Sequence, residues 1–388
     1  MISTKQNDKN YVASTYARFD LEITRGKGSL VYDSEGREYI DLSSGIATNT
    51  FGMCDSEWTE AVTRQLSLFQ HTSNLYYSEP CATLARMLSE RTGAKKVFFS
   101  NSGAEANECA IKVARKWARE NKPEGHNTII TLKNSFHGRT VTTLSATGQD
   151  TFHTDFHPFT EGFVYAEANN SQALVELVKS TPCCAIMVEL VQGEGGVMAL
   201  DGEFVDTVKA LAREHELLII VDEVQTGNGR CGSLYAYMQY GLTPDVVTTA
   251  KGLGGGLPIG ATMMFDRVEG TLTPGSHGST FGGNPVSCAA AISVLKRIDD
   301  TLLADVRRKS EYIKKALTGA KGIKSVSGLG LMLGIETERD AGEIIRECME
   351  LGVLPIKAKH KVRLLPALNI PDELLQRAID VIKTVAAR

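Results

Sequence analysis

Short apolar runs alternate with helical stretches through the middle of the chain, from about residue 60 to residue 250. Five segments are apolar at consecutive positions: KKVFFS, NTIITL, AIMVEL, LLIIVDEV and DVVTTA. A strand that is apolar on both sides is buried on both faces, which is typical of a parallel sheet covered by helices. Residues 203–216 carry apolar side chains at helical spacing directly before the strand at 217–221. The pattern predicts an α/β fold with a mainly parallel central sheet.

The two ends of the chain follow a different pattern. The first ~55 residues contain short strand-like pieces with a turn at Asp33–Gly36. The last ~100 residues contain a helix-like stretch at 286–320, the strand-like LGLMLGIET, an amphipathic stretch at 340–351, VRLLPAL and a closing helix. We therefore expect both ends to join into a smaller α+β domain. The predicted segments are 1–58 (smaller domain), 59–285 (large domain) and 286–388 (smaller domain).

Composition narrows the classes of function. The 388 residues carry a net charge of −4, which does not favour nucleic acid or an anionic membrane as a partner. The start MISTKQNDKN is polar, and no apolar run approaches the ~20 residues that a membrane span needs. The eight cysteines form no CxxC pair, so we expect reduced thiols in a cytoplasmic protein.

Histidines give no convincing metal site. His153 and His157 are four residues apart, as zinc ligands on one helix can be, but Pro158 indicates an irregular loop. We therefore predict no bound metal. His137, which precedes the turn at Gly138, could act as an acid or base.

The segment FFSNSGAEANECAIKVAR predicts a strand, a polar turn and a long helix. The free backbone N–H groups and positive dipole of a helix N-terminus can bind phosphate, and Gly103 would allow a close approach. The alternative is an ordinary capped helix, with Ser102 as the N-cap and Glu105 three residues later. Taken alone, this segment favours the ordinary cap.

Two charged residues follow buried strands. Asp222 comes after LLIIV, where a carboxylate is costly to bury unless it meets a cation or strong donors; the alternative is an acid that faces solvent. Lys251 comes after DVVTTA and before a glycine-rich loop. A lysine in such low polarity has a lowered pKa and can act as a Schiff-base amine. A Walker-type loop is excluded, since there the lysine follows the glycines. Together with the phosphate-binding helix, these residues predict a pyridoxal-phosphate enzyme.

The chain resembles the class III (ω-type) aminotransferases of the fold-type-I pyridoxal-phosphate-dependent transferases. The resemblance spans nearly the whole chain. It is carried, in the family's order and spacing, by SGIATNT, SNSGAEANECAIKVAR, SFHGRTVTTLSATGQ, VELVQGEGGV, IIVDEVQTGNGR, TTAKGLGGGLPIGA, HGSTFGGNPVSCAAA and VRLLPALNI. In this superfamily a lysine moves the proton, so the resemblance implies a structural role for His137.

The resemblance implies a cofactor site built around Lys251, which would hold pyridoxal 5'-phosphate as a Schiff base and move a proton. Asp222 would pair with the pyridinium nitrogen and keep the ring an electron sink. Val224 and Phe136 would pack on the two faces of the ring, and Gln225 would hydrogen-bond its phenolic oxygen. The implied cofactor-binding set is Ser102, Gly103, Ala104, Phe136, Asp222, Glu223, Val224, Gln225, Lys251 and Thr280.

The resemblance also implies substrate contacts. Arg139 would grip a carboxylate through a bidentate fork, and Ser279 would contact substrate across a dimer interface. Arg363 would bind the α-carboxylate of 2-oxoglutarate or glutamate, and Glu194 would pair with that arginine while an amine substrate is bound. At Ile46, ornithine-specific relatives carry a tyrosine that contacts the free α-amino group. Isoleucine there favours an acylated substrate.

A homodimer follows from the same resemblance, because Thr280 would reach the phosphate of the neighbouring subunit's cofactor. The implied reaction transfers the terminal amino group of N2-acetyl-L-ornithine to 2-oxoglutarate, by a ping-pong cycle through the pyridoxamine form, in arginine biosynthesis. The products are N-acetylglutamate 5-semialdehyde and glutamate. Succinylornithine, N-succinyl-diaminopimelate, ornithine and GABA remain alternative donors. A non-catalytic cofactor-binding regulatory protein is a remote alternative, since such a protein would be expected to lose Lys251 or the arginines.

Overall fold

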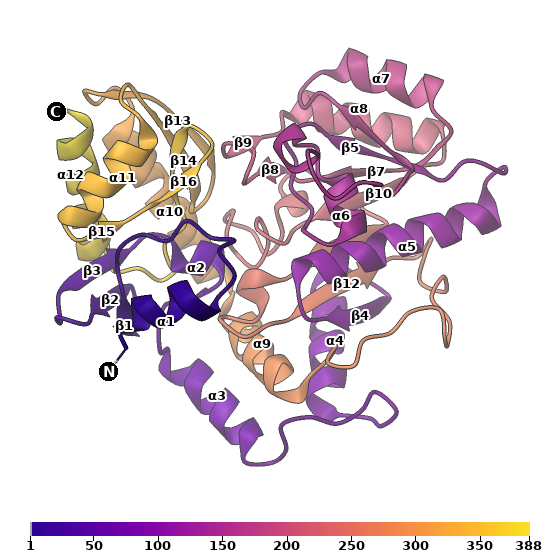
Figure 1. Cartoon of the computed structure of the whole chain (residues 1–388). Helices are drawn as coiled ribbons and strands as arrows, with labels where there is room; N and C mark the ends of the chain where they lie inside the picture. The colour runs from indigo at the N-terminus through magenta and orange to yellow at the C-terminus, as the bar shows by residue number, and fades with distance from the viewer. Residues whose placement is uncertain (1) are drawn as a thin grey trace.

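The computed structural model describes residues 2–388, and its largest element is a seven-stranded sheet (Figure 1). The strands lie in the order β4 (Lys96–Ser100), β12 (Gly260–Met264), β11 (Val246–Thr249), β10 (Leu218–Asp222), β7 (Cys183–Val188), β5 (Thr128–Leu132) and β6 (Phe163–Ala166). The five apolar runs form β4, β5, β7, β10 and β11, as predicted. Neighbours from β11 to β6 are parallel, whereas β12 runs antiparallel to both β11 and β4. The α/β fold with a mainly parallel sheet is confirmed.

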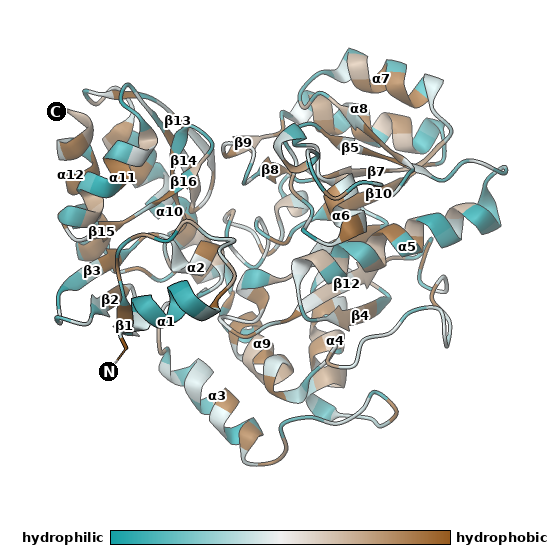
Figure 2. Cartoon of the chain, viewed as in Figure 1, coloured by the Kyte–Doolittle hydropathy of each residue, from teal (hydrophilic) through white to brown (hydrophobic). Residues whose placement is uncertain are grey.

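Helices cover both faces of this sheet because successive strand residues point to opposite sides. Ile220 of β10 packs in the core beneath α5 (Gly103–Asn121), whereas Ile219 packs in the core beneath α7 (Ser171–Ser180) and α8 (Gly202–Glu214). The predicted helix at 203–216 is α8. Figure 2 shows hydrophobic colour on the central strands and hydrophilic colour on α1 (Thr4–Tyr11), none of whose residues is buried.

Both ends of the chain contribute to a second core. One sheet has the order β1 (Ile23–Lys27), β2 (Leu30–Asp33), β3 (Glu38–Asp41) and β15 (Val353–Leu354), and the other has the order β13 (Ile323–Leu329), β14 (Met332–Thr337), β17 (Lys361–Leu364) and β16 (Ile356–Ala358). Strands β15 and β3 pair in parallel, which joins the C-terminal segment to the N-terminal one. Helices α10 (Asp300–Leu317), α11 (Ala341–Glu350) and α12 (Asp372–Ala386) pack on this core.

The helix-like stretch at 286–320 is two helices. Helix α9 (Pro285–Arg297) ends before Ile298, and Asp299 caps α10 by accepting a hydrogen bond from the backbone N–H of Leu302. Helix α9 packs on α3 (Ser56–Leu66) and α4 (Glu79–Thr92), and so it belongs to the core of the large sheet. The segment boundaries at 58 and 285 stay a prediction. The remaining elements are α2 (Ser44–Ala47), α6 (Val141–Ala146), η1 (Asp150–Phe152), β8 (Val191–Gln192), β9 (Met198–Ala199), η2 (Ala236–Met238) and η3 (Lys251–Leu253).

Candidate active site

A cavity of about 390 Å³ lies at the carboxyl ends of the large sheet's strands, the usual ligand position in such sheets and a usual size for a ligand pocket. The residues that line it follow β4, β5, β7, β10 and β11 in the chain. Nine residues predicted from the sequence are among them: Ser102, Gly103, Ala104, Phe136, Arg139, Asp222, Val224, Gln225 and Lys251.

The N-terminus of α5 opens onto this cavity. Ser102 caps the helix by accepting a hydrogen bond on its Oγ from the Glu105 backbone N–H at 3.2 Å. The capped helix and the phosphate-binding helix are therefore compatible, since the cap uses one N–H and Gly103 and Ala104 still line the cavity. Gly103 cannot be replaced without movement, because a Cβ there would lie 2.6 Å from Cγ1 of Val224.

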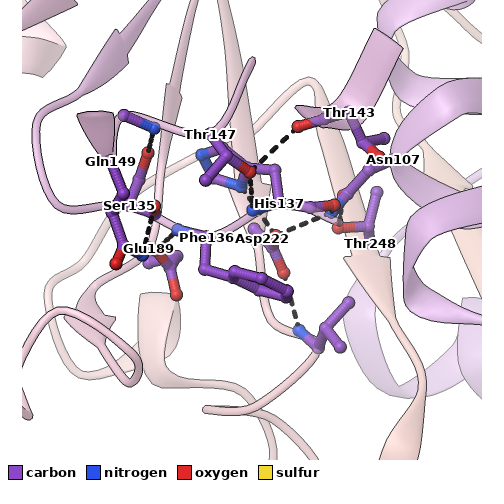
Figure 3. A network of polar contacts seen from close by, with 12 residues as sticks. Asn107, Ser135, Phe136, His137, Thr143, Thr147, Gln149, Glu189, Asp222 and Thr248 are labelled. Carbon is purple, nitrogen blue, oxygen red and sulfur yellow. Dashed lines mark hydrogen bonds and ion pairs between the residues drawn. The ribbon is translucent and has the colours of Figure 1, made fainter. Parts of the chain in front are cut away.

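Asp222 is held by three donors on the floor of the cavity (Figure 3). Its Oδ2 accepts from Asn107 Nδ2 at 2.8 Å and lies 2.8 Å from His137 Nδ1, while its Oδ1 accepts from the Val224 backbone N–H at 3.0 Å. Thr248 donates to Oδ1 of Asn107 and so orients that amide towards the carboxylate. Asp222 is 3% exposed. These three contacts fix the position of the carboxylate at the cavity.

Lys251 begins η3 with a φ of +43°, a left-handed conformation that costs free energy in a residue with a Cβ. Burial lowers the pKa of its amine; the negative charge of Glu194 raises that pKa and the positive charge of Arg363 lowers it again. A lowered pKa increases the fraction of neutral, nucleophilic amine near neutral pH. Lys251 therefore has the environment that a covalent attachment needs.

Glu194 and Arg363 form an ion pair at 2.6 Å, and Arg363 is 2% exposed. Nη1 of Arg363 also donates to Oε1 of Gln225 at 3.2 Å, which links the pair to a cavity residue. Burial acts to raise the pKa of Glu194, but the charge and hydrogen bonding of Arg363, the charge of Lys251 and the Gln225 hydrogen bond together lower it below its ordinary value. The structure thus brings together two residues that are 169 positions apart in the chain.

Arg139 and the Ser279–Thr280 pair lie at the edges of the site. Arg139 is exposed and lines the cavity, and its guanidinium lies 4.2 Å from the ring centroid of Phe152. Ser279 and Thr280 line a neighbouring surface hollow with Asn101 and Glu105, outside the Lys251 cavity of their own chain. Their position therefore leaves them available to another molecule.

Ile46 lies in a strained turn beside the site. Ser44, Gly45, Ile46 and Ala47 all have positive φ, so α2 is a left-handed turn, and α2 packs on η3. The Ile46 side chain is 44% exposed and does not line the cavity.

Glu223 is a correction to the predicted cofactor contacts. Its side chain turns away from the cavity into the core, where its carboxylate accepts hydrogen bonds from Thr226 Oγ1 and from the Tyr237 backbone N–H. Asp222 lines the cavity and Glu223 does not, so these adjacent carboxylates point in different directions. Burial raises the pKa of Glu223 to about 7.

The sequence does not identify as site residues the other eleven residues that line the cavity, among them Thr48, Asn107, His137 and Glu189. Asn107 is four residues after Gly103 on the same helix face, and Glu189 follows an apolar strand as Asp222 does. Both residues could therefore have been predicted as site residues from the sequence. His137 was assigned a structural role, and its contact with Asp222 shows that this role is to orient the carboxylate. Nothing in the local sequence around Thr48 indicates its contact with the cavity.

No cluster of three or more potential metal ligands occurs among residues 2–388. The two histidines considered for zinc pack on an aromatic ring instead. His153 and His157 lie 5.1 and 4.6 Å from the ring centroid of Phe159. Within the same residues, no helix is long and apolar enough to cross a membrane.

Fold and site together define a transferase of the α/β class with a reactive lysine, and comparison with known proteins assigns the family. The model of the class III aminotransferases matches residues 11–386, and the chain belongs to that family. Class III aminotransferases are transaminases that use pyridoxal 5'-phosphate.

Individual relatives cover nearly the whole chain. The acetylornithine aminotransferase of Haemophilus ducreyi is 50% identical over 98% of both chains. Among solved structures, the ornithine aminotransferase of Toxoplasma gondii matches with a TM-score of 0.93 at 33% identity, covering 98% of this chain and 93% of that one. The N-acetylornithine aminotransferase of Stenotrophomonas maltophilia matches with a TM-score of 0.85 at 35% identity, covering 96% of this chain and 97% of that one.

The residues present fit this cofactor. The α5 N-terminus suits a phosphate, Asp222 offers a carboxylate to a ring nitrogen, and Lys251 offers a buried amine for covalent attachment. Val224 and Phe136 both line the space between these groups and can hold a flat ring. The fit depends on Gly103, since a Cβ there would collide with Val224.

Proposed function

We propose that the protein is an N-acetylornithine:2-oxoglutarate aminotransferase, which moves the terminal amino group of N2-acetyl-L-ornithine to 2-oxoglutarate in arginine biosynthesis. The 50% identity to a relative named acetylornithine aminotransferase supports this substrate. Ile46, in place of a tyrosine that could contact a free α-amino group, supports an acylated donor over ornithine. A cytoplasmic location is part of the same proposal, and the eight cysteines, all free thiols, suit a reducing compartment.

The observation that carries the proposal is the Glu194–Arg363 ion pair. The site must accept two different substrates in turn. 2-Oxoglutarate carries two carboxylates, whereas the reacting end of the donor carries an amine. With Glu194 bound to it, Arg363 is neutralised and the site accepts the amine end. When Glu194 moves away, Arg363 offers a bidentate fork to the α-carboxylate of 2-oxoglutarate. Arg139, exposed at the cavity mouth, is placed to hold the distal carboxylate of either substrate.

Four residues would prepare the site for chemistry. Pyridoxal phosphate, when bound, supplies an electron sink that lets an amine-bearing carbon lose a proton. Asp222 keeps a negative charge opposite the ring nitrogen, and Asn107 and His137 hold that carboxylate in place. Lys251, once its amine is free, would take up a proton on Nζ and release it again, and its lowered pKa suits both steps.

We also infer a homodimer. The segment from Leu66 to Tyr77 and the neighbouring Phe281 expose large apolar side chains, with Leu75 88% and Tyr76 70% exposed. Asn74 Nδ2 donates to the backbone oxygens of Ser279 and Gly282, which joins this segment to the Ser279–Thr280 hollow as one surface. An apolar surface of this kind marks an interface, and a two-fold dimer would bring Thr280 to the partner's site.

The dimer is tested with Leu75→Glu, which places a charge on the exposed surface without disturbing the core. We expect this variant to sediment as a monomer at assay concentration and to retain pyridoxal phosphate poorly. Leu351→Glu is the control, since Leu351 is 46% exposed and lies in the C-terminal part of the chain. A wild-type monomer with full activity would contradict the dimer.

The substrate is tested by kcat/KM on N-acetylornithine, ornithine and GABA, each with 2-oxoglutarate. We expect N-acetylornithine to be preferred, and Ile46→Tyr to raise kcat/KM for ornithine relative to N-acetylornithine by about tenfold, the value of one hydrogen bond to a charged group. Equal wild-type rates on ornithine and N-acetylornithine would refute the Ile46 argument.

A further inference from the structure

Glu189 lies directly beside Asp222 at the ends of two neighbouring strands. Val188 of β7 and Val221 of β10 are partners in the parallel ladder, and each strand continues into its carboxylate. Glu189 is 5% exposed and lines the same cavity as Asp222. Two carboxylates so placed share one buried space, where both cannot be ionised without cost.

The two carboxylates differ in the number of donors that they meet. Asp222 has Asn107 Nδ2, His137 Nδ1 and the Val224 N–H within 3.0 Å. Glu189 has one such donor, the backbone N–H of Phe136, which lies 2.8 Å from its Oε2. Figure 3 shows Glu189 on the Phe136 side of this network and Asp222 at its centre. Because donors stabilise the ionised form, this geometry places the charge on Asp222 and the proton on Glu189.

The charges around Glu189 agree with that assignment. Burial and the negative charge of Asp222 raise the pKa of Glu189 well above its ordinary value. The Phe136 N–H and the positive charge of Lys251 oppose the shift, and the charge of Glu194 adds to it.

We propose that Glu189 holds the proton of the Glu189–Asp222 pair, so that a neutral carboxylic acid anchors the backbone of Phe136 and Asp222 alone carries negative charge at the ends of β7 and β10. Glu189 is thereby a positioning residue for the reaction described above, and its catalytic meaning rests on the proposed function. Its protonation is a property of the folded chain and can be measured without turnover.

A neutral Glu189 has two consequences for the site. An ionised Glu189 would raise the pKa of Lys251, so its neutrality favours the free amine. A neutral acid also keeps one O–H donor besides the oxygen that accepts from Phe136, and it can offer this donor to a ligand in the cavity. The side of the cavity formed by Phe136 is therefore held without adding a further negative charge to those of Glu194 and Asp222 near Lys251.

Infrared spectroscopy of the wild-type protein with ¹³C-labelled glutamate tests the proposal. Among residues 2–388, the glutamates with a raised pKa are Glu189 and Glu223, and Glu223 is ionised well above pH 7. We expect one protonated-carboxyl band that moves with the glutamate label and persists at about pH 8.5, where an ordinary glutamic acid is ionised. Absence of any label-sensitive band at that pH would overturn the proposal. Because the measurement uses the wild-type protein, it does not depend on the folding of a variant.

Glu189→Gln and Glu194→Gln form a matched pair for the holoenzyme. Glutamine copies a neutral acid, so Glu189→Gln should remove the infrared band and leave unmoved the pH midpoint of the bound cofactor's absorbance. Glu194→Gln removes a real negative charge near Lys251 and should lower that midpoint by about one pH unit while keeping the band. An equal lowering of the midpoint in Glu189→Gln would show that Glu189 is ionised and refute the proposal. A protein without a lysine-bound cofactor would refute the proposed function and leave the infrared result standing.

Discussion

The two sides of the active site are built in different ways. The side that we call the cofactor floor (Asn107, His137, Asp222 and Lys251) comes from strand ends and one helix of the large sheet, and Asp222 there meets three donors. The side that we call the substrate rim (Ile46, Arg139, Glu194 and Arg363) comes from an N-terminal turn, two loops and strand β17 of the second core. Several hydrogen bonds fix the Asp222 carboxylate of the floor, whereas the rim contains one ion pair, which we propose opens during the reaction. The difference supports the proposed division of roles, in which the floor holds the cofactor and the rim selects the substrate.

Removal of the amine of the cofactor floor should have the largest effect. Lys251→Ala is expected to lower the transamination rate by at least about 10⁴-fold, because both proton transfer and covalent attachment are lost. The rate with N-acetylornithine and 2-oxoglutarate measures this. Lys95→Ala, a change at a half-exposed surface ion pair, is the control. Full activity of Lys251→Ala would show that the reaction does not depend on the amine of the cofactor floor.

Loss of the carboxylate of the cofactor floor should come next. Asp222→Ala leaves the buried donors of Asn107 and His137 without their acceptor and removes the charge opposite the ring nitrogen. Breaking a buried charged network of this kind costs the fold about 3–5 kcal/mol. Loss of one preorganised electrostatic group from a site lowers kcat by about 10²- to 10³-fold, and we expect a fall of that size here. Asp266→Ala, which changes an exposed carboxylate, should leave kcat unchanged. A drop smaller than tenfold in Asp222→Ala would mean that the floor does not depend on this charge.

A change in the substrate rim should affect one half-reaction more than the other. Arg363→Ala is expected to raise KM for 2-oxoglutarate by about 10- to 100-fold, because a buried fork for a carboxylate is lost. The half-reaction with the amine donor should change much less, since Glu194 neutralises Arg363 there. Single-turnover rates of the two half-reactions separate these effects. Arg346→Ala, a change at an exposed residue of α11, is the control. Equal losses in both half-reactions would contradict a switch.

The smallest effect on catalysis should come from Glu223, which is adjacent to Asp222 in the chain but lies in the core. Its pKa is raised to about 7 in the folded protein, so folding favours its protonated form. Stability is therefore lost as the pH rises from the unfolded pKa of about 4.5 towards 7, by about 3 kcal/mol in total. Glu223→Gln should flatten the dependence of Tm on pH in that range. An unchanged slope would show that Glu223 is already ionised in the fold.

The sequence predicts the cofactor floor better than the rim, for a physical reason. Lys251 and Asp222 each follow a run of buried apolar residues, so the strand that positions them is visible beside them in the sequence. Strand β12, by contrast, is short and begins with Gly260 directly after the glycine-rich loop, and the apolar pattern does not predict it, although it separates β4 from β11. The direction of Glu223 could not be predicted, because it depends on hydrogen bonds from Thr226 and from the Tyr237 backbone beyond the end of β10.

The rest of the site depends on contacts between distant segments. The resemblance to the family pairs Glu194 with Arg363, but their 2.6 Å contact and its link to Gln225 depend on tertiary packing that brings Arg363 of β17 to Glu194 and Gln225. The break between α9 and α10 depends on Asp299 acting as a cap, which the continuous apolar pattern of 286–320 concealed. The left-handed turn at Ile46 has no marker in the sequence except Gly45.

The most direct test of the central claim is to locate the cofactor on the chain. The holoenzyme is reduced with borohydride and digested, and the peptides are analysed by mass spectrometry. The account predicts that one lysine, Lys251, carries the mass of reduced pyridoxal phosphate, and that Lys251→Ala carries none. Modification of a different lysine, or of none, would contradict it.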